Sequence, residues 1–250
     1  IEDYLQMVSA EQKEYAEVFD YSKITEKSSV ITDYWTNNLL ELILRKDNLN
    51  KAYKQVKRNK GKGGIDGMQV DELLPFLREN QDTLIRKIRE GKYKPNPVRR
   101  VEIPKETEGE FRKLGVPTVV DRVIQQAIAQ ELSPVYEKQF SENSFGFRPK
   151  RGAHDALRQC QKNVNDGYVY VVDMDLEKFF DTVCQSKLIE VLSRTVKDGR
   201  VISLIHKYLN AGVVANGKFE RTEVGMPQGG PLSPLLSNIM LNELDKELES

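Results

Sequence analysis

Residues 168–181 read YVYVVDMDLEKFFD, an apolar run that passes directly into acidic and aromatic residues. The β-branched and aromatic side chains predict a strand over residues 168–176, the strongest in the sequence. Because side chains alternate between the two faces of a strand, Asp173 and Asp175 are expected to point the same way. Paired carboxylates suit a hard cation such as Mg²⁺, which prefers oxygen ligands. The alternative is structural, since aspartates after a strand also cap helices or bind an arginine.

The composition is that of a globular protein. The 250 residues include 38 Lys and Arg against 38 Asp and Glu, and 39% of them are hydrophobic. No run reaches the roughly 18–20 apolar residues of a membrane span, and the first residues lack the pattern of a secretory signal. Cys160 and Cys184 are the only cysteines, so a disulfide scaffold or a zinc site is not expected. The sequence predicts a cytoplasmic location and no membrane partner.

The zero net charge hides an uneven distribution. Residues 1–50 carry five basic and ten acidic side chains, whereas residues 51–105 carry fifteen basic and seven acidic ones. A basic block of this kind favours a polyanion as partner. For any single lysine, the simpler interpretation is a solvated outer face of an amphipathic helix.

Apolar periodicity predicts helices separated by isolated strands, which indicates an α+β chain. Helices are expected over residues 39–45, 48–59, 71–90, 121–140, 153–164, 186–195, 200–210 and 235–248, with Pro134 bending or splitting one of them. In the helix after Gly152, the pattern places Ala153, Leu157, Cys160 and Val164 inward. Strands are expected over residues 98–103 and 111–116, and a hairpin over 213–219 turns at Asn216-Gly217.

Two glycine-rich loops stand out. Residues 60–67 read KGKGGIDG and residues 225–234 read GMPQGGPLSP. Glycines allow a backbone to approach a ligand closely, and glycines before a helix expose N–H groups to a phosphate or nucleotide. Gln228, inside the second loop, could reach a base, a sugar or a template edge.

Five blocks of sequence occur in an order that identifies a family. They are residues 99–105, 112–127, 144–149, 173–181 and 227–234. Together they resemble the reverse-transcriptase blocks of bacterial group II intron maturases. The resemblance covers residues 38–250, whereas residues 1–37 match no known pattern and are an amino-terminal extension of unknown role.

The resemblance implies a right-hand polymerase fold: helix-rich α+β, with a fingers β-hairpin and a small antiparallel palm sheet. Residues 38–165 would form the fingers, including the amino-terminal block, and residues 166–250 a partial palm. The family's second carboxylate pair, in a Tyr-Ala-Asp-Asp turn, does not occur before Ser250. The chain by itself is therefore expected to be an inactive polymerase fragment.

The same resemblance implies site residues. Asp175 would be the catalytic carboxylate and, with the Leu176 carbonyl, a ligand of two Mg²⁺ ions, because in the family an aromatic follows the metal ligand by five positions and Phe180 does so here. Asp173 would be a structural carboxylate or would support a metal ligand without binding the ion itself. Phe180 would pack under the incoming sugar, with Gln228 beside the nucleotide. The triphosphate would bind Arg99, Lys105 and Arg112, and RNA would bind Lys54, Lys57, Arg58, Lys60, Lys62 and Arg148.

The leading functional hypothesis is an RNA-directed DNA polymerase that copies RNA from a primer DNA, binds group II intron RNA and assists splicing. The alternative is an RNA-binding maturase module that helps splicing without polymerising. A third hypothesis, a metal-dependent nuclease or small-nucleotide enzyme, predicts Mg²⁺-dependent activity in this chain alone. The sequence leaves a homodimer open.

Overall fold

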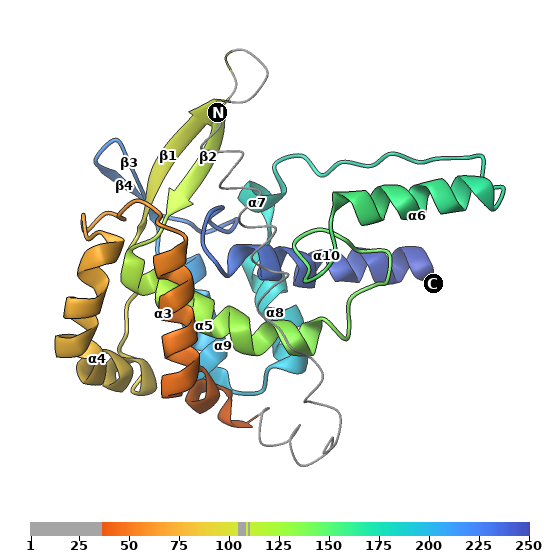
Figure 1. The fold of residues 1–250 in the computed structure, drawn as a ribbon. Helices are drawn as coiled ribbons and strands as arrows, with labels where there is room; N and C mark the ends of the chain where they lie inside the picture. The colour runs from red at the N-terminus through yellow and green to blue at the C-terminus, as the bar shows by residue number, and fades with distance from the viewer. Residues whose placement is uncertain (1–36, 105–108, 110) are drawn as a thin grey trace. The chain divides into compact units, whose positions relative to one another are not determined.

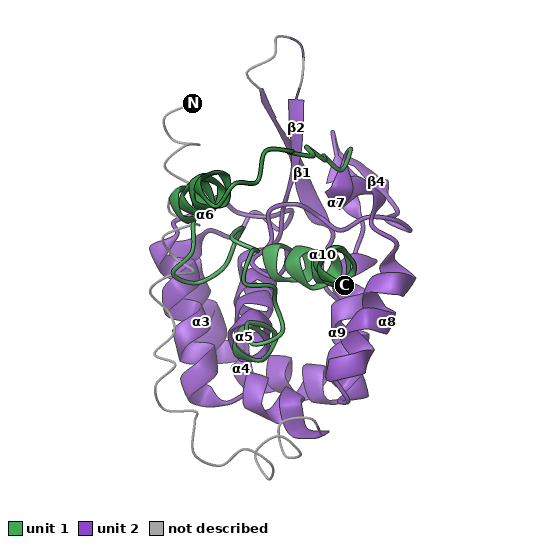
Figure 2. Cartoon of the chain, turned by 90° about the vertical axis from the view of Figure 1, so that its right-hand side faces the viewer, with its two compact units in different colours: residues 1–26, 133–177, 234–250 green, residues 27–132, 178–233 purple. Residues whose placement is uncertain are grey.

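The computed structural model describes residues 37–104, 109 and 111–250 (Figure 1). The chain divides into two compact units (Figure 2). Among the described residues, unit 1 comprises residues 133–177 and 234–250, and unit 2 comprises those of residues 37–132 and 178–233. Helices α5 (Val119–Tyr136) and α10 (Ser233–Glu249) each begin in one unit and end in the other.

Unit 2 contains a four-stranded mixed sheet in the order β2-β1-β3-β4. Strands β1 (Val98–Pro104) and β2 (Phe111–Val116) form the predicted antiparallel hairpin, which Figure 1 shows as a long two-stranded arm. The base of β1 pairs in parallel with β3 (Val213–Ala215), and β3 pairs antiparallel with β4 (Lys218–Glu220). Asn216 and Gly217 both have positive φ, as a primed hairpin turn requires, so the predicted turn is confirmed.

Unit 2 also contains helices, which loops connect. The helices are residues 37–43, α3 (Lys46–Arg58), the 3₁₀ helix η2 (Val70–Glu72), α4 (Leu73–Arg89), the first part of α5, α7 (Phe179–Thr182), α8 (Gln185–Thr195) and α9 (Gly199–Leu209). The largest fully buried side chains come from residues 39–43, α4, α5, α8 and α9, with Ile239 of α10 in unit 1. The apolar periodicity therefore located most of the helices and the faces that they bury.

Polar side chains fix two of these helices to each other. Asn48, inside α3, donates from Nδ2 to the Ala127 carbonyl of α5 at 3.0 Å. Gln130 of α5 donates in return to Asn48 Oδ1 at 2.6 Å. Both residues are buried, so each group satisfies the other in a place that water does not reach.

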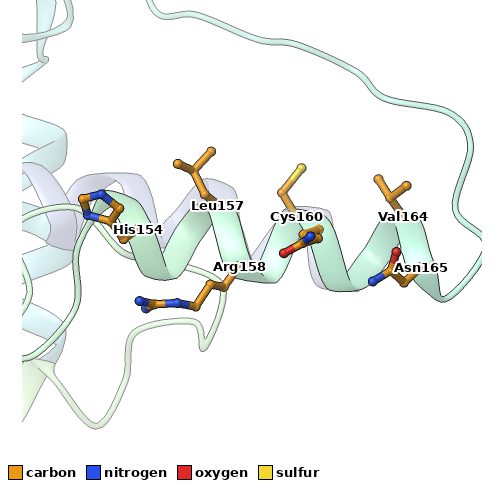
Figure 3. Close-up of a pocket in the computed structure, with 7 residues that line it drawn as sticks. His154, Leu157, Arg158, Cys160, Val164 and Asn165 are labelled. Atoms are coloured by element: carbon orange, nitrogen blue, oxygen red, sulfur yellow. The ribbon is translucent and has the colours of Figure 1, made fainter.

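In unit 1, α6 (Ala153–Asn165) forms where predicted but buries none of its residues, so the prediction of an inward face is wrong. Figure 3 shows Leu157, Cys160 and Val164 projecting from one side of α6. These side chains line a shallow, open pocket. The pattern gave the amphipathic face correctly. Whether such a face is covered depends on a neighbouring element, and periodicity carries no information on that neighbour.

Residues 168–176 do not form the predicted strand; they run as irregular, exposed chain. Tyr170, for example, is 93% exposed. A strand is stable only when a neighbouring strand accepts and donates its backbone hydrogen bonds. None of the strands in the described part of the chain pairs with these residues, so high β-propensity alone does not suffice.

Two smaller differences concern helices. α5 continues through Pro134 instead of dividing there, because a proline removes one backbone donor without preventing the next turn when the surrounding helix is otherwise complete. Helix α10 begins at Ser233, directly after the glycine- and proline-rich loop. The α+β class, with a helix-rich body and a fingers-type hairpin, is confirmed, although the sheet is mixed rather than purely antiparallel.

Candidate nucleotide and RNA site

The loop over residues 225–230 is held at both ends by backbone hydrogen bonds. At its start, the Met226 N–H donates to the Phe180 carbonyl of α7 at 2.8 Å. At its end, the Gln228 carbonyl accepts from the Gly115 N–H of β2 at 2.6 Å. Ser233 adds a bond from its hydroxyl to the Pro227 carbonyl at 2.6 Å. The segments that carry Phe180 and Gln228 are thereby joined to each other and to the fingers hairpin.

Glycines make this close packing possible. Gly225 has φ of +82°, and a Cβ there would lie 2.8 Å from the carbonyl oxygens of Phe180 and Asp181. Gly229 has φ of +119°, and its Cβ would lie 2.8 Å from the Gly115 oxygen. These distances are too short for any side chain, so the glycines serve the contact between the loop and its two supports.

Replacing Gly225 with alanine is expected to lower the free energy of unfolding by about 2–3 kcal/mol, because the new methyl group meets two carbonyl oxygens and φ is positive. Gly217 is a matched control: its φ is +76°, and nothing lies within 4 Å of a Cβ there. Gly217→Ala should therefore cost only about 1 kcal/mol, the penalty of positive φ alone. Chemical denaturation of both variants measures the difference. Equal losses would contradict the close contact.

Two arginines donate hydrogen bonds to the first glycine-rich loop, residues 60–67. Arg99 of β1 donates from Nη2 to the Gly63 carbonyl at 2.9 Å, and Arg122 of α5 donates to the Lys62 carbonyl. Gly64 lies against the Thr118 backbone, because a Cβ added at Gly64 would lie only 2.6 Å from the Thr118 Cα. Burial lowers the pKa of the Arg122 guanidinium; the charge of Asp66 opposes this shift, and Arg99 adds to it. Arg99, expected at the triphosphate, thus also holds the loop.

A buried carboxylate, Asp121, binds the hydroxyl of Thr118, whose backbone lies against this loop. Asp121 of α5 is fully buried and accepts hydrogen bonds from the Tyr93 hydroxyl (2.6 Å), the Thr118 hydroxyl (2.7 Å) and the Asn96 N–H (3.1 Å). Burial raises the pKa of the Asp121 carboxyl above its ordinary value, although all three donors act to lower it. Burial and the Asp121 charge likewise raise the pKa of Tyr93. The cluster ties the segment before β1 to the start of α5.

The predicted metal ligands belong to unit 1. Asp173 and Asp175 are exposed on the irregular segment 168–176, as is Leu176. Their oxygen atoms have the chemistry that a hard cation prefers. In the described portion of the sequence, however, no three His, Cys, Asp or Glu side chains come together as a metal site. These residues therefore offer part of a ligand set and do not complete one.

The predicted RNA-binding lysines are accessible. Lys54 and Lys57 lie on the exposed side of α3, and Lys60 and Lys62 follow it, all exposed. Arg58 is also exposed and donates to Gln55 at 3.0 Å. Arg112 of β2 is exposed as well, whereas Lys105 lies outside the described residues. The Lys54 and Lys57 side chains therefore lie exposed on one helix, where they can face solvent or a polyanion.

Arg148 does not belong in that group, and its predicted RNA contact is wrong. It is 2% exposed and pairs with Glu137 through Nε (3.0 Å) and Nη2 (2.7 Å). Its Nη1 donates to the Ser141 and Ser144 carbonyls, and the guanidinium lies over the Phe140 ring. All of its nitrogens are already engaged, so Arg148 fixes the chain after α5 instead of reaching for a ligand.

Three residues of the block over residues 112–127 position the site, although the sequence predicted no role for them. Asp121, Arg122 and Gln125 lie in the first two turns of α5. They contact different neighbours: Asp121 the Tyr93 hydroxyl, Arg122 the Lys62 carbonyl and Gln125 the Gly230 backbone. Gln125 lies against Gly230, whose Cβ would meet its side-chain oxygen. Polar residues in an otherwise apolar, buried helix were the signal that could have identified them.

Comparisons with known proteins identify the family of the chain. Residues 103–250 match the family model described as reverse transcriptase (RNA-dependent DNA polymerase), so the chain belongs to the reverse transcriptase family. It is 37% identical to the group II intron-encoded protein LtrA of Lactococcus lactis subsp. cremoris, over 90% of this chain and 37% of that protein. It is 38% identical to Protein YkfC of Escherichia coli (strain K12), over 84% of this chain and 56% of that protein.

Other relatives include the mitochondrial nuclear intron maturase 2 of Arabidopsis thaliana, which is 33% identical over 52% of this chain and 23% of that protein. A chain of a solved partial Cas6-RT-Cas1--Cas2 complex superposes with a TM-score of 0.55 at 23% identity, over 84% of this chain and 35% of its own length, which shows a shared fold. The resemblance to group II intron reverse transcriptases is confirmed. The chain covers 37% of the length of LtrA and 56% of the length of YkfC.

A membrane-spanning helix is not found among the residues that the structure describes, because none of their helices is long and apolar enough. The cytoplasmic location stays a prediction.

Proposed function

We propose that this chain is the fingers and partial palm of an RNA-directed DNA polymerase, with fingers over residues 38–165 and palm from residue 166. Membership of the reverse transcriptase family supports the reaction. The single observation that carries the role of this chain is the hydrogen-bonded assembly of α7, the loop over residues 225–230 and the β1–β2 hairpin. It brings together the segments that bear Phe180, Gln228 and the basic residues of the hairpin.

Each of these residues has a chemical role in the proposal. Arg99, Lys105 and Arg112 neutralise the triphosphate, since phosphoryl transfer depends on positioning and on charge stabilisation. Phe180 supports the deoxyribose and excludes a 2′-hydroxyl by shape, while Gln228 lies along the nucleotide. Asp175 and the Leu176 carbonyl supply oxygen ligands, and Mg²⁺ is the cation we propose for them. When bound, such ions stabilise the charge that develops in nucleotidyl transfer.

RNA and a primer DNA are the partners that we propose, with group II intron RNA as the template and as a splicing substrate. Similarity to a group II intron-encoded protein and to an intron maturase supports the intron RNA. The maturase alternative, RNA binding and splicing without polymerisation, is favoured by the exposed cations of α3. Both roles can reside in one protein.

DNA synthesis by the complete protein that carries residues 1–250 tests the proposal. A DNA primer annealed to an RNA template should be extended with deoxynucleotides, and chelation of divalent cations should stop the extension. RNA binding and splicing assistance without any extension would favour the maturase alternative. Cleavage of RNA or DNA by this chain alone in Mg²⁺ would instead favour the nuclease hypothesis.

The cations in α3 and directly after it predict how RNA affinity depends on the salt concentration. Replacing Lys54, Lys57 and Lys60 with glutamine should weaken RNA binding and reduce the slope of log affinity against log salt by about 2, because each phosphate contact releases counterions. Filter binding over a range of salt concentrations measures the slope. A control triple, Lys187, Arg194 and Lys197 to glutamine, removes the same charge from exposed positions in and after α8. Equal slopes for both triples would show a general charge effect and contradict an α3 contact.

A further inference from the structure

Gln185 joins three parts of unit 2 through one buried amide. It is the first residue of α8 and is 5% exposed. Its Nε2 lies 2.8 Å from the Gly225 carbonyl, 3.2 Å from the Leu209 carbonyl and 3.4 Å from the Thr222 carbonyl. A neutral donor suits this place, because three carbonyl oxygens converge on it and would repel a carboxylate.

The Gly225 bond is the shortest of the three, and it lies where the loop over residues 225–230 begins. The Gly225 N–H donates to the Val183 carbonyl at 2.8 Å, and the next N–H, of Met226, donates to Phe180. Gly225 is therefore held from its carbonyl side by Gln185 and from its amide side by the chain after α7. Because its φ is positive and its Cβ position is occupied, the residue has little room to move.

The geometry points to a role for Gln185 beyond packing. We propose that Gln185 is a positioning residue that sets the loop over residues 225–230 against Phe180, and through it the affinity for the incoming nucleotide and the discrimination between deoxyribose and ribose. The inference rests on the proposed function, since it concerns the same nucleotide site. Gln185 touches neither substrate nor reacting atoms; it acts through the Gly225 carbonyl, three residues before Gln228.

The other contacts of Gln185 allow a matched control. Thr222 donates from its hydroxyl to the Leu209 carbonyl at 2.8 Å and accepts from the Gly212 N–H at 3.2 Å. Thr222→Val removes these bonds in the same neighbourhood but leaves the Gln185 bond to Gly225 in place. A loss of packing near α9 and a loss of loop positioning are thereby separated.

Gln185→Met keeps the length of the side chain and removes its donor. In primer extension on an RNA template by the complete protein, we expect the KM for deoxynucleotides to rise about tenfold with kcat changed less than about threefold. The preference for deoxynucleotides over ribonucleotides should fall severalfold. Gln185→His, which retains one N–H donor, should restore most of both values. Thr222→Val should lower the melting temperature and leave KM and the sugar preference unchanged.

Three outcomes overturn the inference: unchanged KM and sugar preference in Gln185→Met, equal shifts in Thr222→Val, or no restoration by histidine. If Gln185→Met does not fold, Gln185→Asn takes its place, because one methylene fewer withdraws the amide from the Gly225 carbonyl. The KM for deoxynucleotides should then rise severalfold, and an unchanged KM overturns the role. Failure of the unchanged protein to extend a primer rejects the proposed function itself, whereas normal synthesis with an indifferent Gln185 rejects this inference alone.

Discussion

Replacement of Asp175 with alanine is expected to lower RNA-templated DNA synthesis by the complete protein at least about a thousandfold, which corresponds to about 4 kcal/mol of transition-state stabilisation. The carboxylate has the oxygen chemistry of a hard-cation ligand, and it precedes Phe180 by the five positions expected of the family's metal ligand. Its side chain lies exposed and takes no part in the core. The substitution should therefore leave stability and RNA affinity nearly unchanged. Primer extension and RNA binding, measured on the same preparation, check both statements.

Asp173 provides the control for Asp175. It lies two positions earlier on the same exposed segment, so Asp173→Ala makes the same chemical change in a similar environment. We expect a loss of DNA synthesis of no more than about tenfold for Asp173→Ala, because a carboxylate outside the ligand set stabilises the reacting charges only indirectly. Equal losses in the two variants would contradict the choice of Asp175. A parallel loss of splicing assistance in Asp175→Ala would contradict the separation of polymerisation from RNA binding.

Asp121→Ala is expected to have the largest effect on stability, a loss of about 3–5 kcal/mol in the free energy of unfolding. The substitution leaves the Tyr93 hydroxyl, the Thr118 hydroxyl and the Asn96 N–H without their acceptor in a buried place. Each unsatisfied buried donor costs about 1–3 kcal/mol, and the sum exceeds what most single substitutions do. Chemical denaturation measures the loss. Asp82→Ala, on the exposed side of α4, should change stability by less than about 0.5 kcal/mol.

The same carboxyl predicts a pH dependence of stability. Burial raises the pKa of Asp121 above 3.8, so between 3.8 and the raised value the folded protein binds more protons than the unfolded chain. Stability from this group is therefore fully present below pH 3.8 and is lost as the pH rises through the folded pKa. Asp121→Asn removes the titration and retains an acceptor for Thr118. The stability of the unchanged protein relative to Asp121→Asn should fall with rising pH; an increase would contradict a raised pKa.

Local sequence patterns predicted the hairpins well because their determinants are local. Asn216 and Gly217 adopt the positive φ that a two-residue turn needs, and this preference belongs to the residue types themselves. The β1–β2 hairpin likewise formed within one residue of its predicted bounds. Apolar periodicity located the helices for the same reason, since the residues that form one face of a helix are only three or four positions apart in the sequence.

Partners distant in sequence were not predictable in this way. Arg148 has the appearance of a surface cation in the sequence, and only the fold places Glu137 and two carbonyls around it. The segment 168–176 has the highest β-propensity of the chain, yet it pairs with no strand among residues 37–104, 109 and 111–250. In both places the deciding factor is a neighbour, and neither charge nor propensity specifies which neighbour is present.

The sequence by itself determined the family and the order of the blocks, because these depend on residue types at fixed spacings; it also predicted which residues would meet a nucleotide. The strand over residues 168–176, which seemed the most secure element, depended on pairing and did not follow from its residues. Only the tertiary structure joined Phe180, Gln228 and the fingers hairpin, through bonds to Gly115 and Gly225 from segments more than a hundred residues apart in places. Close approach of backbones is a property of the packed chain, and no local pattern encodes it.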